Sequence, residues 1–495
     1  MGETGLSIIK IQIHRFENNG RMLKRKESNM LLEMIRKGQP MTLRQQVALT
    51  LLLSLPSMLA QITHILMQYI DASMVGGLGA QATASIGLVS TTIWLFGGMV
   101  SASSSGFSVQ VAHSIGANDM SKARDVFRQS ISATMIFCLF LALIGLSITP
   151  SLPRWLGGGD DIAADASHYF LIFILCIPAM QIDHLCASML RCSGNMFIPS
   201  MLNIMMCVLD VIFNFLFIFP TRDVSMLGMS LTLPGAGLGV VGAALGTAVA
   251  EWLTALLMAY FAIVRSPELS LTKERGSFRP TARIVNKALR IGLPMGCQHV
   301  IMCGAQITST IIVAPLGTFA IAANSLAVTA ESVCYMPGYG IGEAATTLVG
   351  QSIGAARRDL TWRFSKITLA LGMGIMTFMG IVMFFAAPYM MAIMTPVEEV
   401  RQLGTMALRI EAFAEPMFAA SIVCYGIFVG AGDTMIPAVM NLSSIWLVRI
   451  TLAALLTPRL GLNGAWIAMC VELCVRGAIF LIRLKRGKWV GQVSS

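Results

Sequence analysis

The sequence predicts an all-α polytopic membrane protein with twelve transmembrane helices in two six-helix bundles related by an internal repeat. Three observations lead to this fold class. The chain of 495 residues is 55% hydrophobic and only 12% charged, whereas about a quarter of the residues in a soluble domain are charged. Long apolar runs recur along the whole chain, and the first half matches the second half in motifs and spacing.

The apolar runs define the helices in order. Each run is close to or longer than the roughly 20 residues that a helix needs to cross a bilayer. They cover residues 48–70, 85–112, 130–149, 168–190, 198–220, 239–264, 288–315, 320–350, 366–393, 407–430, 436–457 and 463–483. The runs are continuously apolar, whereas the strands of a membrane barrel alternate, so helices are favoured. The predicted units are an N-terminal segment (1–45), an N-lobe (46–266), a linker (267–286), a C-lobe (287–485) and a tail (486–495).

The internal repeat has a constant offset over most of its length. Pro56 matches Pro294 and Gly116 matches Gly354, each pair being 238 positions apart (354 − 116). The offset falls to 222 (461 − 239) after residues 220–236, so the first half carries a loop about 16 residues longer. Two similar helical lobes with the substrate between them are a common transporter design.

Charge predicts the orientation in the membrane. Nine Lys or Arg residues precede the first span, and seven lie between spans six and seven. Loops on the opposite side hold few: Arg154, Arg222, Arg401, Arg409 and Arg459. By the positive-inside rule, both termini face the cytoplasm. A prokaryotic cytoplasmic (inner) membrane is the expected location.

Several function classes are disfavoured. The sequence has no Gly-x-x-x-x-Gly-Lys-Ser/Thr loop, and its Cys and His spacing lacks a zinc pattern. Its eleven cysteines lie in or beside apolar spans, where they serve as small packing residues. The net charge of +10 is spread over short loops, so no nucleic-acid partner is expected. The chain is therefore predicted to be no enzyme and to need no cofactor or obligatory protein partner. An ion gradient is the expected energy source.

Span one carries a stripe of polar side chains. Its members follow steps of four and three residues and so share one helical face: Ser57, Gln61, His64, Gln68 and Asp71. Pro56 begins the stripe and removes a backbone hydrogen bond, so a bend is expected there. Ionisable groups inside spans are costly and mark functional sites by default. Packing against neighbouring helices is the alternative explanation of the stripe.

Span five repeats this arrangement with Asn203, Asp210 and Asn214 on one face. Asp71 and Asp210 both lie in the outward part of their helices, so we expect them to converge in one cavity of the N-lobe. Two carboxylates with amide oxygens nearby can bind a proton or a desolvated Na⁺. With Na⁺, Asp71 and Asp210 would be the metal ligands. The alternative is a single acid held by one Ser or Asn hydrogen bond.

The C-lobe lacks this pair, because Ser309 stands opposite Asp71 in the repeat and Val448 stands opposite Asp210. Coupling-ion chemistry is therefore expected in the N-lobe, and substrate binding in the C-lobe. Candidates for contact with substrate or cavity, counting both lobes, are Gln61, His64, Gln68, His299, Gln306, Glu331, Glu411 and Glu415. Glu411 and Glu415 are four residues apart and would share a helical face. The sequence does not assign roles to Glu251, Glu472 or Arg449.

Four segments carry a resemblance to a known family. They are Tyr69-Ile70-Asp71 through Gly76-Gly77-Leu78-Gly79, Met336-Pro337-Gly338-Tyr339-Gly340-Ile341-Gly342, Leu348-Val349-Gly350-Gln351-Ser352-Ile353-Gly354-Ala355 and Gly430-Ala431-Gly432-Asp433-Thr434-Met435-Ile436-Pro437. In combination, over roughly residues 45–488, they resemble the multidrug and toxic compound extrusion (MATE) family.

The resemblance implies two six-helix bundles in a V shape and H⁺- or Na⁺-coupled export of small organic, often cationic, compounds. Asp71 matches the family's first-helix cation-binding acid, Pro56 its bending proline, and Asp210 the fifth-helix acid of the DinF-like branch. Met302 stands where the NorM-like branch has its seventh-helix acid, so the pattern leans DinF-like, although Met206 replaces the Asn that the family has one turn before the fifth-helix acid. A lipid-linked oligosaccharide flippase is the alternative, although Arg449 and Arg476 are the only deep basic residues.

Overall fold

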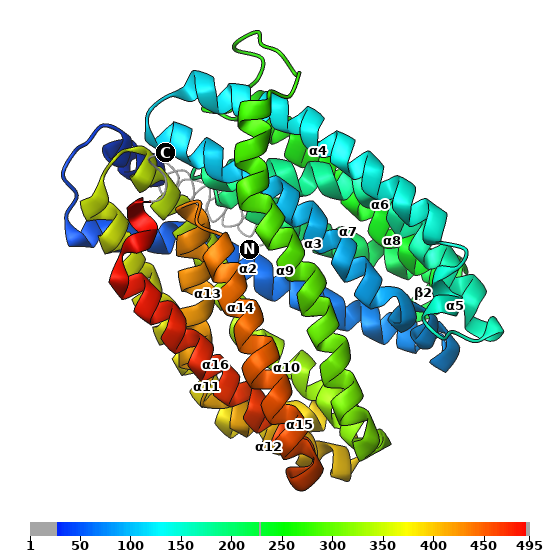
Figure 1. The fold of residues 1–495 in the computed structure, drawn as a ribbon. Coiled ribbons are helices and arrows are strands. Elements are labelled where there is room, and N and C mark those ends of the chain that lie inside the picture. The colour runs from blue at the N-terminus through cyan, green and yellow to red at the C-terminus, as the bar shows by residue number, and fades with distance from the viewer. Residues whose placement is uncertain (1–26, 227–228, 492–495) are drawn as a thin grey trace, which may run out of the picture.

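The computed structural model describes residues 27–226 and 229–491. Within these residues, eleven helices are long and apolar enough to cross a membrane, and a bent pair raises the number to twelve. The predicted all-α fold with twelve spans in two lobes is confirmed (Figure 1). The predicted segments 1–45 and 486–495 lie partly outside the described residues.

The N-lobe begins with a helix of residues 27–36, which leads into the first span. Its spans are α2 (Leu43–Gly76), α3 (Ala80–Gly116), α4 (Met120–Ile148), α6 (Asp160–Cys192), α7 (Phe197–Ile218) and α8 (Gly239–Tyr260), with a short α5 (Leu152–Trp155) between α4 and α6. Thr42 and Gln45 form a reciprocal capping box that fixes the start of α2. Pro56 lies within α2, and the helix continues through it without interruption.

The C-lobe repeats this order. Its helices are α9 (Ala282–Val313), α10 (Thr318–Gly354), α11 (Arg358–Met394), α12 (Glu398–Ala412), α13 (Glu415–Gly430), α14 (Met435–Ser443), α15 (Thr451–Leu460) and α16 (Leu462–Arg486). A π-helical stretch joins α14 to α15, so that Met435–Leu460 forms one span. Gly79 and Gly317, which are 238 positions apart, precede α3 and α10 with φ angles of 113° and 94°. Residues with side chains rarely adopt such angles.

Two features differ from the sequence-based expectation. Span ten, expected as one helix over residues 407–430, consists of α12 and α13, which are bent by 60° at a break around Phe413 and Ala414. The extra residues after α7 form an antiparallel hairpin of β1 (Pro220–Met226) and β2 (Met229–Ala236). The hairpin accounts for the longer loop in the first half, and its strands lack the long apolar run that predicts a span.

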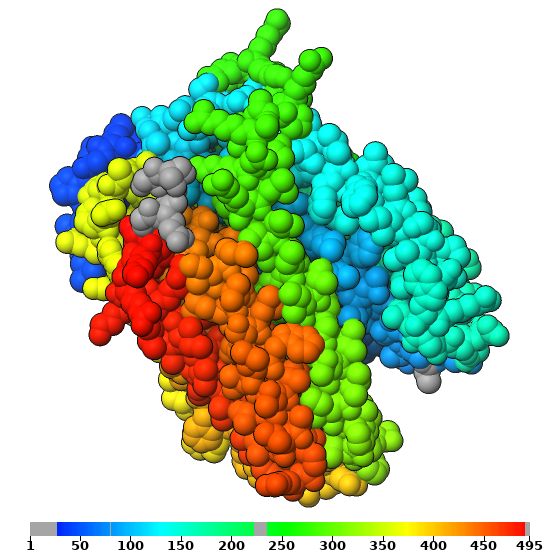
Figure 2. All heavy atoms as spheres, viewed as in Figure 1, coloured from blue at the N-terminus to red at the C-terminus, as the bar shows by residue number. Residues whose placement is uncertain are grey.

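The two lobes meet at one end of the molecule and diverge toward the other (Figures 1 and 2). We call the meeting end, which carries residues 191–195, 266–281 and 354–358, the joined end. The opposite end, with residues 77–79, 219–226, 229–238 and 314–318, is the open end. Between the lobes, α2 packs against α10 and α3 packs against α9. These two pairings are equivalent under the internal repeat.

The crossing of α3 and α10 at the joined end is closely packed. A Cβ atom added at Gly116 would lie 2.1 Å from the carbonyl oxygen of Gln351, and one added at Gly354 would lie 2.1 Å from that of His113. The two contacts are related by the 238-residue offset (351 − 113). Only glycine therefore permits this approach of the two backbones.

The same two partners also make equivalent hydrogen bonds between the lobes. The His113 ring donates from Nε2 to the carbonyl oxygen of Gly430 (2.9 Å), and Gln351 donates from Nε2 to that of Cys192 (2.8 Å). Cys192 and Gly430 are the last residues of α6 and α13. The internal repeat thus produces a two-fold related lock that closes the joined end.

Candidate functional site

Asp71, Asp210 and Asn214 form the best-defined polar site in the N-lobe. The Asn214 amide donates from Nδ2 to Asp71 Oδ1 (3.0 Å) and to Asp210 Oδ2 (3.1 Å). Asp210 and Asn214 are one turn apart on α7, and Asp71 comes from the last part of α2. One amide group therefore joins two carboxylates from different spans, and the expected convergence of these acids is present.

Local packing explains how this polar group fits between apolar helices. Asp210 and Asn214 are 0% and 1% exposed, whereas Asp71 is half-buried. A Cβ atom added at Gly246 of α8 would lie 2.1 Å from Asn214 Oδ1, so only a glycine leaves room for the amide. Tyr169 of α6 lies close to both acids, and Thr247 of α8 is a polar neighbour of Asp210. The pair is thus enclosed by four spans and remains accessible through Asp71.

The two carboxylates lack a cationic partner. No ion pair within the described residues includes Asp71 or Asp210, and Asp210 Oδ1 and Asn214 Oδ1 are buried without a hydrogen-bond partner. Two adjacent carboxylates repel each other when both are charged and poorly solvated. A proton or a monovalent cation on the pair would remove that repulsion. Within residues 27–226 and 229–491, no group of three or more His, Cys, Asp or Glu side chains could hold a metal ion.

The remaining polar residues of spans one and five occupy different surroundings. Ser57 is buried near the joined end and donates to Glu343 of α10 (2.9 Å), whose carboxylate also lies 3.6 Å from Arg191. His64 and Gln68 bond to each other (3.2 Å). Gln61 is half-buried, and Asn203 lies two turns before Asp210 on α7. The structure therefore brings together Asp71, Asp210 and Asn214, and it places Asn203 farther along the helix.

Of the two C-lobe candidates on α9, His299 lies on the packing surface between the lobes. A Cβ atom added at Gly98 of α3 would lie 2.6 Å from Cγ of His299, so the imidazole ring packs directly on the α3 backbone. Gln306 is exposed two turns closer to the open end. His299 is therefore placed where the two lobes pack together, and Gln306 is on the same helix outside this contact.

The predicted carboxylates of the C-lobe are buried inside it. Glu331 is 4% exposed, and Glu411 and Glu415 are 0% exposed. All four carboxylate oxygens of Glu411 and Glu415 lack a hydrogen-bond partner. The break between α12 and α13 separates the two residues, so the expected arrangement on one continuous helical face is wrong. Gly380 of α11 packs against this break, since its added Cβ would lie 3.1 Å from the carbonyl oxygen of Ala412.

A buried ion network beside these acids gives Arg449 and Glu472 a structural assignment. Glu472 is 0% exposed and accepts bonds from Arg476 (2.8 Å), Arg449 (3.0 Å) and Ser444 (2.6 Å). Sequence reasoning did not pair Arg449 with Glu472. The spacing of Glu472 and Arg476 (i, i+4) indicates that these two can pair, whereas no spacing indicates the pair of Glu472 with Arg449.

We expect Glu472→Gln to destabilise the C-lobe. The change leaves two arginine charges in the membrane without a carboxylate, and breaking a buried pair in this way costs about 3–5 kcal/mol. Thermal unfolding of the purified protein in detergent measures the effect. Glu399→Gln, at an exposed position on α12, is the matched control. Equal unfolding temperatures for Glu472→Gln and the control would show that the network does not stabilise the lobe.

Comparisons with known proteins agree with this architecture. The family model described as MatE matches residues 56–216 and again residues 294–455. The two matches begin at Pro56 and Pro294, which are 238 positions apart (294 − 56). The family signature is therefore present once in each lobe.

Curated relatives share about a quarter of their residues with the chain over nearly their whole length. The probable multidrug resistance protein NorM of Thermotoga maritima is 25% identical over 446 residues, which cover 88% of this chain and 92% of that protein. The probable multidrug resistance protein NorM of Neisseria meningitidis serogroup B is 24% identical and covers 90% and 98%.

Solved structures share the fold. A multidrug resistance MATE family transporter of the MOP superfamily in an outward-facing conformation matches with a TM-score of 0.83 at 19% identity, covering 92% of this chain and 97% of the other. A MOP superfamily transporter from Pyrococcus furiosus matches with a TM-score of 0.82 at 19% identity and the same coverage.

Proposed function

The chain belongs to the MatE family, and we propose that it is a secondary active antiporter that exports small organic, often cationic, compounds in exchange for H⁺ or Na⁺. The observation that carries this proposal is the bridging of Asp71 and Asp210 by one Asn214 amide, without a cationic partner. Such a pair takes up one positive charge readily. The names of the relatives, which describe multidrug resistance proteins, support the export of several compounds.

Coupling requires that the ion distinguish two conformations of the protein. A bound ion that had equal affinity for both states would drive nothing. Asp71 lies on α2, which packs against α10 of the other lobe, and Asp210 lies on α7 within its own lobe. Uptake of an ion at the pair therefore acts on a helix that contacts both lobes. We infer that this contact links ion binding to the relative position of the lobes, with Pro56 as the point where α2 can bend.

The distribution of charge supports an orientation with the joined end in the cytoplasm. This end carries the residues between α8 and α9, the start of α4, the start of α11 and the end of α16. Their cations include Lys122, Arg124, Arg265, Arg357 and Arg483. The positive-inside rule assigns such an end to the cytoplasm. The described conformation would then be closed toward the cytoplasm and open to the outside.

The side chains proposed to contact substrate lie on the helices that join the lobes. Gln61, His64 and Gln68 belong to α2, and His299 and Gln306 belong to α9. They supply hydrogen-bonding groups and no fixed charge of their own, which suits compounds of varied shape. Arg449 and Arg476 both pair with Glu472, so they do not form the basic cavity that a lipid-linked oligosaccharide would need. The DinF-like assignment stays a prediction that rests on Asp210 and Met302.

We further propose that Glu411 and Glu415 hold protons in this conformation and do not line the substrate cavity. Buried carboxylates without hydrogen-bond donors are strongly disfavoured as anions. Discontinuous spans such as α12 and α13 commonly mark ion sites in transporters. The charged residues around Glu411 are three acids and one base: Glu331, Glu415, Glu472 and Arg449. Glu472 differs from the pair because two arginines hold it as an anion.

Dicyclohexylcarbodiimide, which modifies protonated carboxyl groups in apolar surroundings, is expected to label Glu415 or Glu411 and to leave Glu472 unlabelled. Peptide mass spectrometry after labelling at several pH values checks this prediction. Labelling is expected to fall as the pH rises, and the adduct is expected to disappear in a Glu411→Gln, Glu415→Gln double variant. Labelling of Glu472 at the same level would show that the reagent does not distinguish paired from unpaired acids, and no labelling of the pair would contradict the proposal.

The proposed export function is tested in bacterial cells that lack their own major efflux pumps. Cells that express the protein are loaded with ethidium, and the fall of fluorescence is followed after energy is restored. We expect faster efflux than in cells with an empty vector, and we expect a protonophore or the removal of the Na⁺ gradient to abolish the difference. Equal efflux with and without the protein, across several fluorescent cations, would contradict the proposal.

A further inference from the structure

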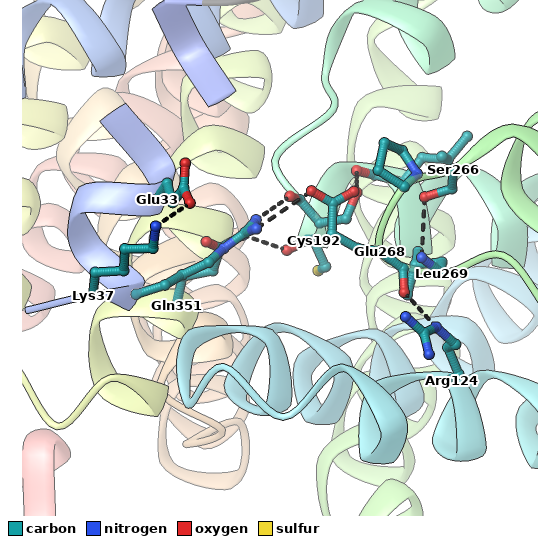
Figure 3. Close-up of polar contacts among 12 residues, drawn as sticks. Glu33, Lys37, Arg124, Cys192, Ser266, Glu268, Leu269 and Gln351 are labelled. Carbon is teal, nitrogen blue, oxygen red and sulfur yellow. Dashed lines mark hydrogen bonds and ion pairs between the residues drawn. The ribbon is translucent and has the colours of Figure 1, made fainter. Parts of the chain in front are cut away.

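The described residues that precede the first span cross the joined end and touch both lobes. We call residues 27–42 the N-terminal strap; it consists of the helix of residues 27–36 and the short connection to α2. Figure 3 shows Glu33 on this helix and Lys37 just after its end, with Cys192 and Glu268 of the N-lobe side and Gln351 of the C-lobe close by. The N-terminal strap therefore lies beside the lock formed by Cys192 and Gln351.

The apolar face of the N-terminal strap is fully buried between the lobes. Leu31, Leu32 and Ile35 are 2%, 1% and 0% exposed. They belong to one hydrophobic cluster with residues of both lobes: Leu49, Leu53 and Met196 from the N-lobe, and Ala344, Leu348, Leu360 and Phe364 from the C-lobe. A Cβ atom added at Gly194 would lie 2.2 Å from Leu32 Cδ1, so the leucine rests on the turn between α6 and α7.

Polar contacts fix both edges of the N-terminal strap. Arg36 donates to the carbonyl oxygen of Ser193 (3.0 Å) and pairs with Glu268 (3.3 Å), on the N-lobe side. Arg357, which precedes α11 of the C-lobe, donates to the carbonyl oxygen of Gln39 (2.6 Å). The segment is therefore attached to one lobe by Arg36 and to the other by Arg357.

Glu268 belongs to a stretch that is itself tied to the N-lobe. The Arg124 guanidinium donates to the carbonyl oxygen of Glu268 (3.0 Å) and pairs with Glu274 (2.5 Å), and this bond holds the pKa of the Glu274 carboxyl below its usual value. The anchor of Arg36 is thus part of the N-lobe rather than a free loop.

We propose that the N-terminal strap is a latch that holds the joined end closed and sets how often it opens. Opening this end must separate Met196 and Gly194 from Leu348 and Phe364, and the three buried side chains of the latch cannot stay on both surfaces. Because α2 continues from the N-terminal strap, we expect the latch to remain with the N-lobe and to leave the C-lobe. The contacts that break are then the Arg357 bond and the apolar contacts with α10 and α11.

The latch goes beyond antiport itself and rests on the proposed function only in requiring that the joined end opens. It would make the rate of alternation depend on a segment outside the twelve spans. Weakening it should raise the population of molecules open at the joined end without changing the site at Asp71 and Asp210.

Hydrogen–deuterium exchange of the full-length protein in lipid nanodiscs tests the latch without any transported compound. In a Leu32→Ala, Ile35→Ala double variant, we expect the amides of residues 190–196 and 344–352 to exchange at least about tenfold faster, which corresponds to about 1.4 kcal/mol. Peptides of the open end, such as residues 70–79, are expected to keep their wild-type rates. Lys37→Ala is the matched control, because Lys37 is exposed and its one ion pair among the described residues is with Glu33, four residues before it.

A milder variant guards against misfolding of the double variant. Arg357→Ala removes the bond to Gln39 together with the ion pair to the exposed Asp359, and it leaves the buried side chains Leu31, Leu32 and Ile35 unchanged. A smaller increase confined to the same peptides is therefore expected. Unchanged exchange at the joined end in both variants, or faster exchange throughout the protein, would overturn the latch. If exchange changes as expected in a protein that exports nothing, the latch stands and the antiporter proposal fails.

Discussion

The Asp71→Asn variant is expected to lose ion-driven efflux while remaining folded in the membrane. Asparagine keeps the shape and one hydrogen-bond acceptor for Asn214, but it cannot take up a proton or carry the charge that attracts a cation. The substitution removes the charge through which an ion bound at Asp71 and Asp210 acts on α2. Coupling free energies of 1–3 kcal/mol change the affinity at a coupled site about 5–150-fold. We expect the efflux rate to fall by a factor near the upper end of this range.

The matched control for this variant is Asp165→Asn, which changes the same chemical group at an exposed position near the start of α6. Ethidium efflux from cells and the amount of protein in the membrane fraction are measured for both variants. Normal efflux by Asp71→Asn, with protein levels equal to wild type, would show that the N-lobe pair does not couple transport.

Gly354→Ala is expected to open the joined end. The added methyl group would stand 2.1 Å from the carbonyl oxygen of His113, so the two backbones at the crossing of α3 and α10 must move apart. Overpacking at close contacts costs about 1–3 kcal/mol, which shifts the balance between the closed and open forms about 5–150-fold toward the open form. Gly116→Ala should act in the same direction, because its contact with Gln351 is the repeat-related one.

Native Cys192 provides the measurement for the glycine variants. Cys192 lies at the end of α6 and is 4% exposed. Its carbonyl oxygen accepts the hydrogen bond from Gln351 that helps to close the joined end. We expect a maleimide reagent to label Cys192 at least about tenfold faster in Gly354→Ala than in wild type. Gly374→Ala is the control, since an added Cβ there meets nothing within 4 Å. Equal labelling of Cys192 in all three proteins would show that the glycine crossing does not hold the joined end closed.

Much of the fold followed from the sequence because membrane spans are long and the repeat is regular. The offset that pairs Pro56 with Pro294 also pairs Cys192 with Gly430 and His113 with Gln351, and these residues form the two-fold related bonds of the joined end. The helical spacing of Asp210 and Asn214 similarly placed both on one face of α7. Periodicity within a helix depends only on residues that are close in the sequence, so it can be recognised without knowledge of the tertiary structure.

Other features depend on contacts between distant segments, which spacing does not encode. The break between Ala412 and Glu415 has one local signal, Pro416 in the first turn of α13, but Gly380 of α11, which packs against the break, is distant in the sequence. Arg449 pairs with Glu472, which lies 23 residues away in the sequence. The helix of residues 27–36 is too short and too polar to read as a span, and its apolar face has meaning only between two assembled lobes.

The most direct test of the account is coupled transport by the purified protein in liposomes. Ethidium flux and proton flux are followed together under an imposed pH gradient or an imposed Na⁺ gradient, in wild type and in Asp71→Asn. We expect one of the two gradients to drive ethidium against its concentration gradient in wild type, and neither gradient to do so in the variant. Ethidium flux that depends on neither gradient, or that is unchanged in Asp71→Asn, would contradict an antiporter coupled through Asp71 and Asp210.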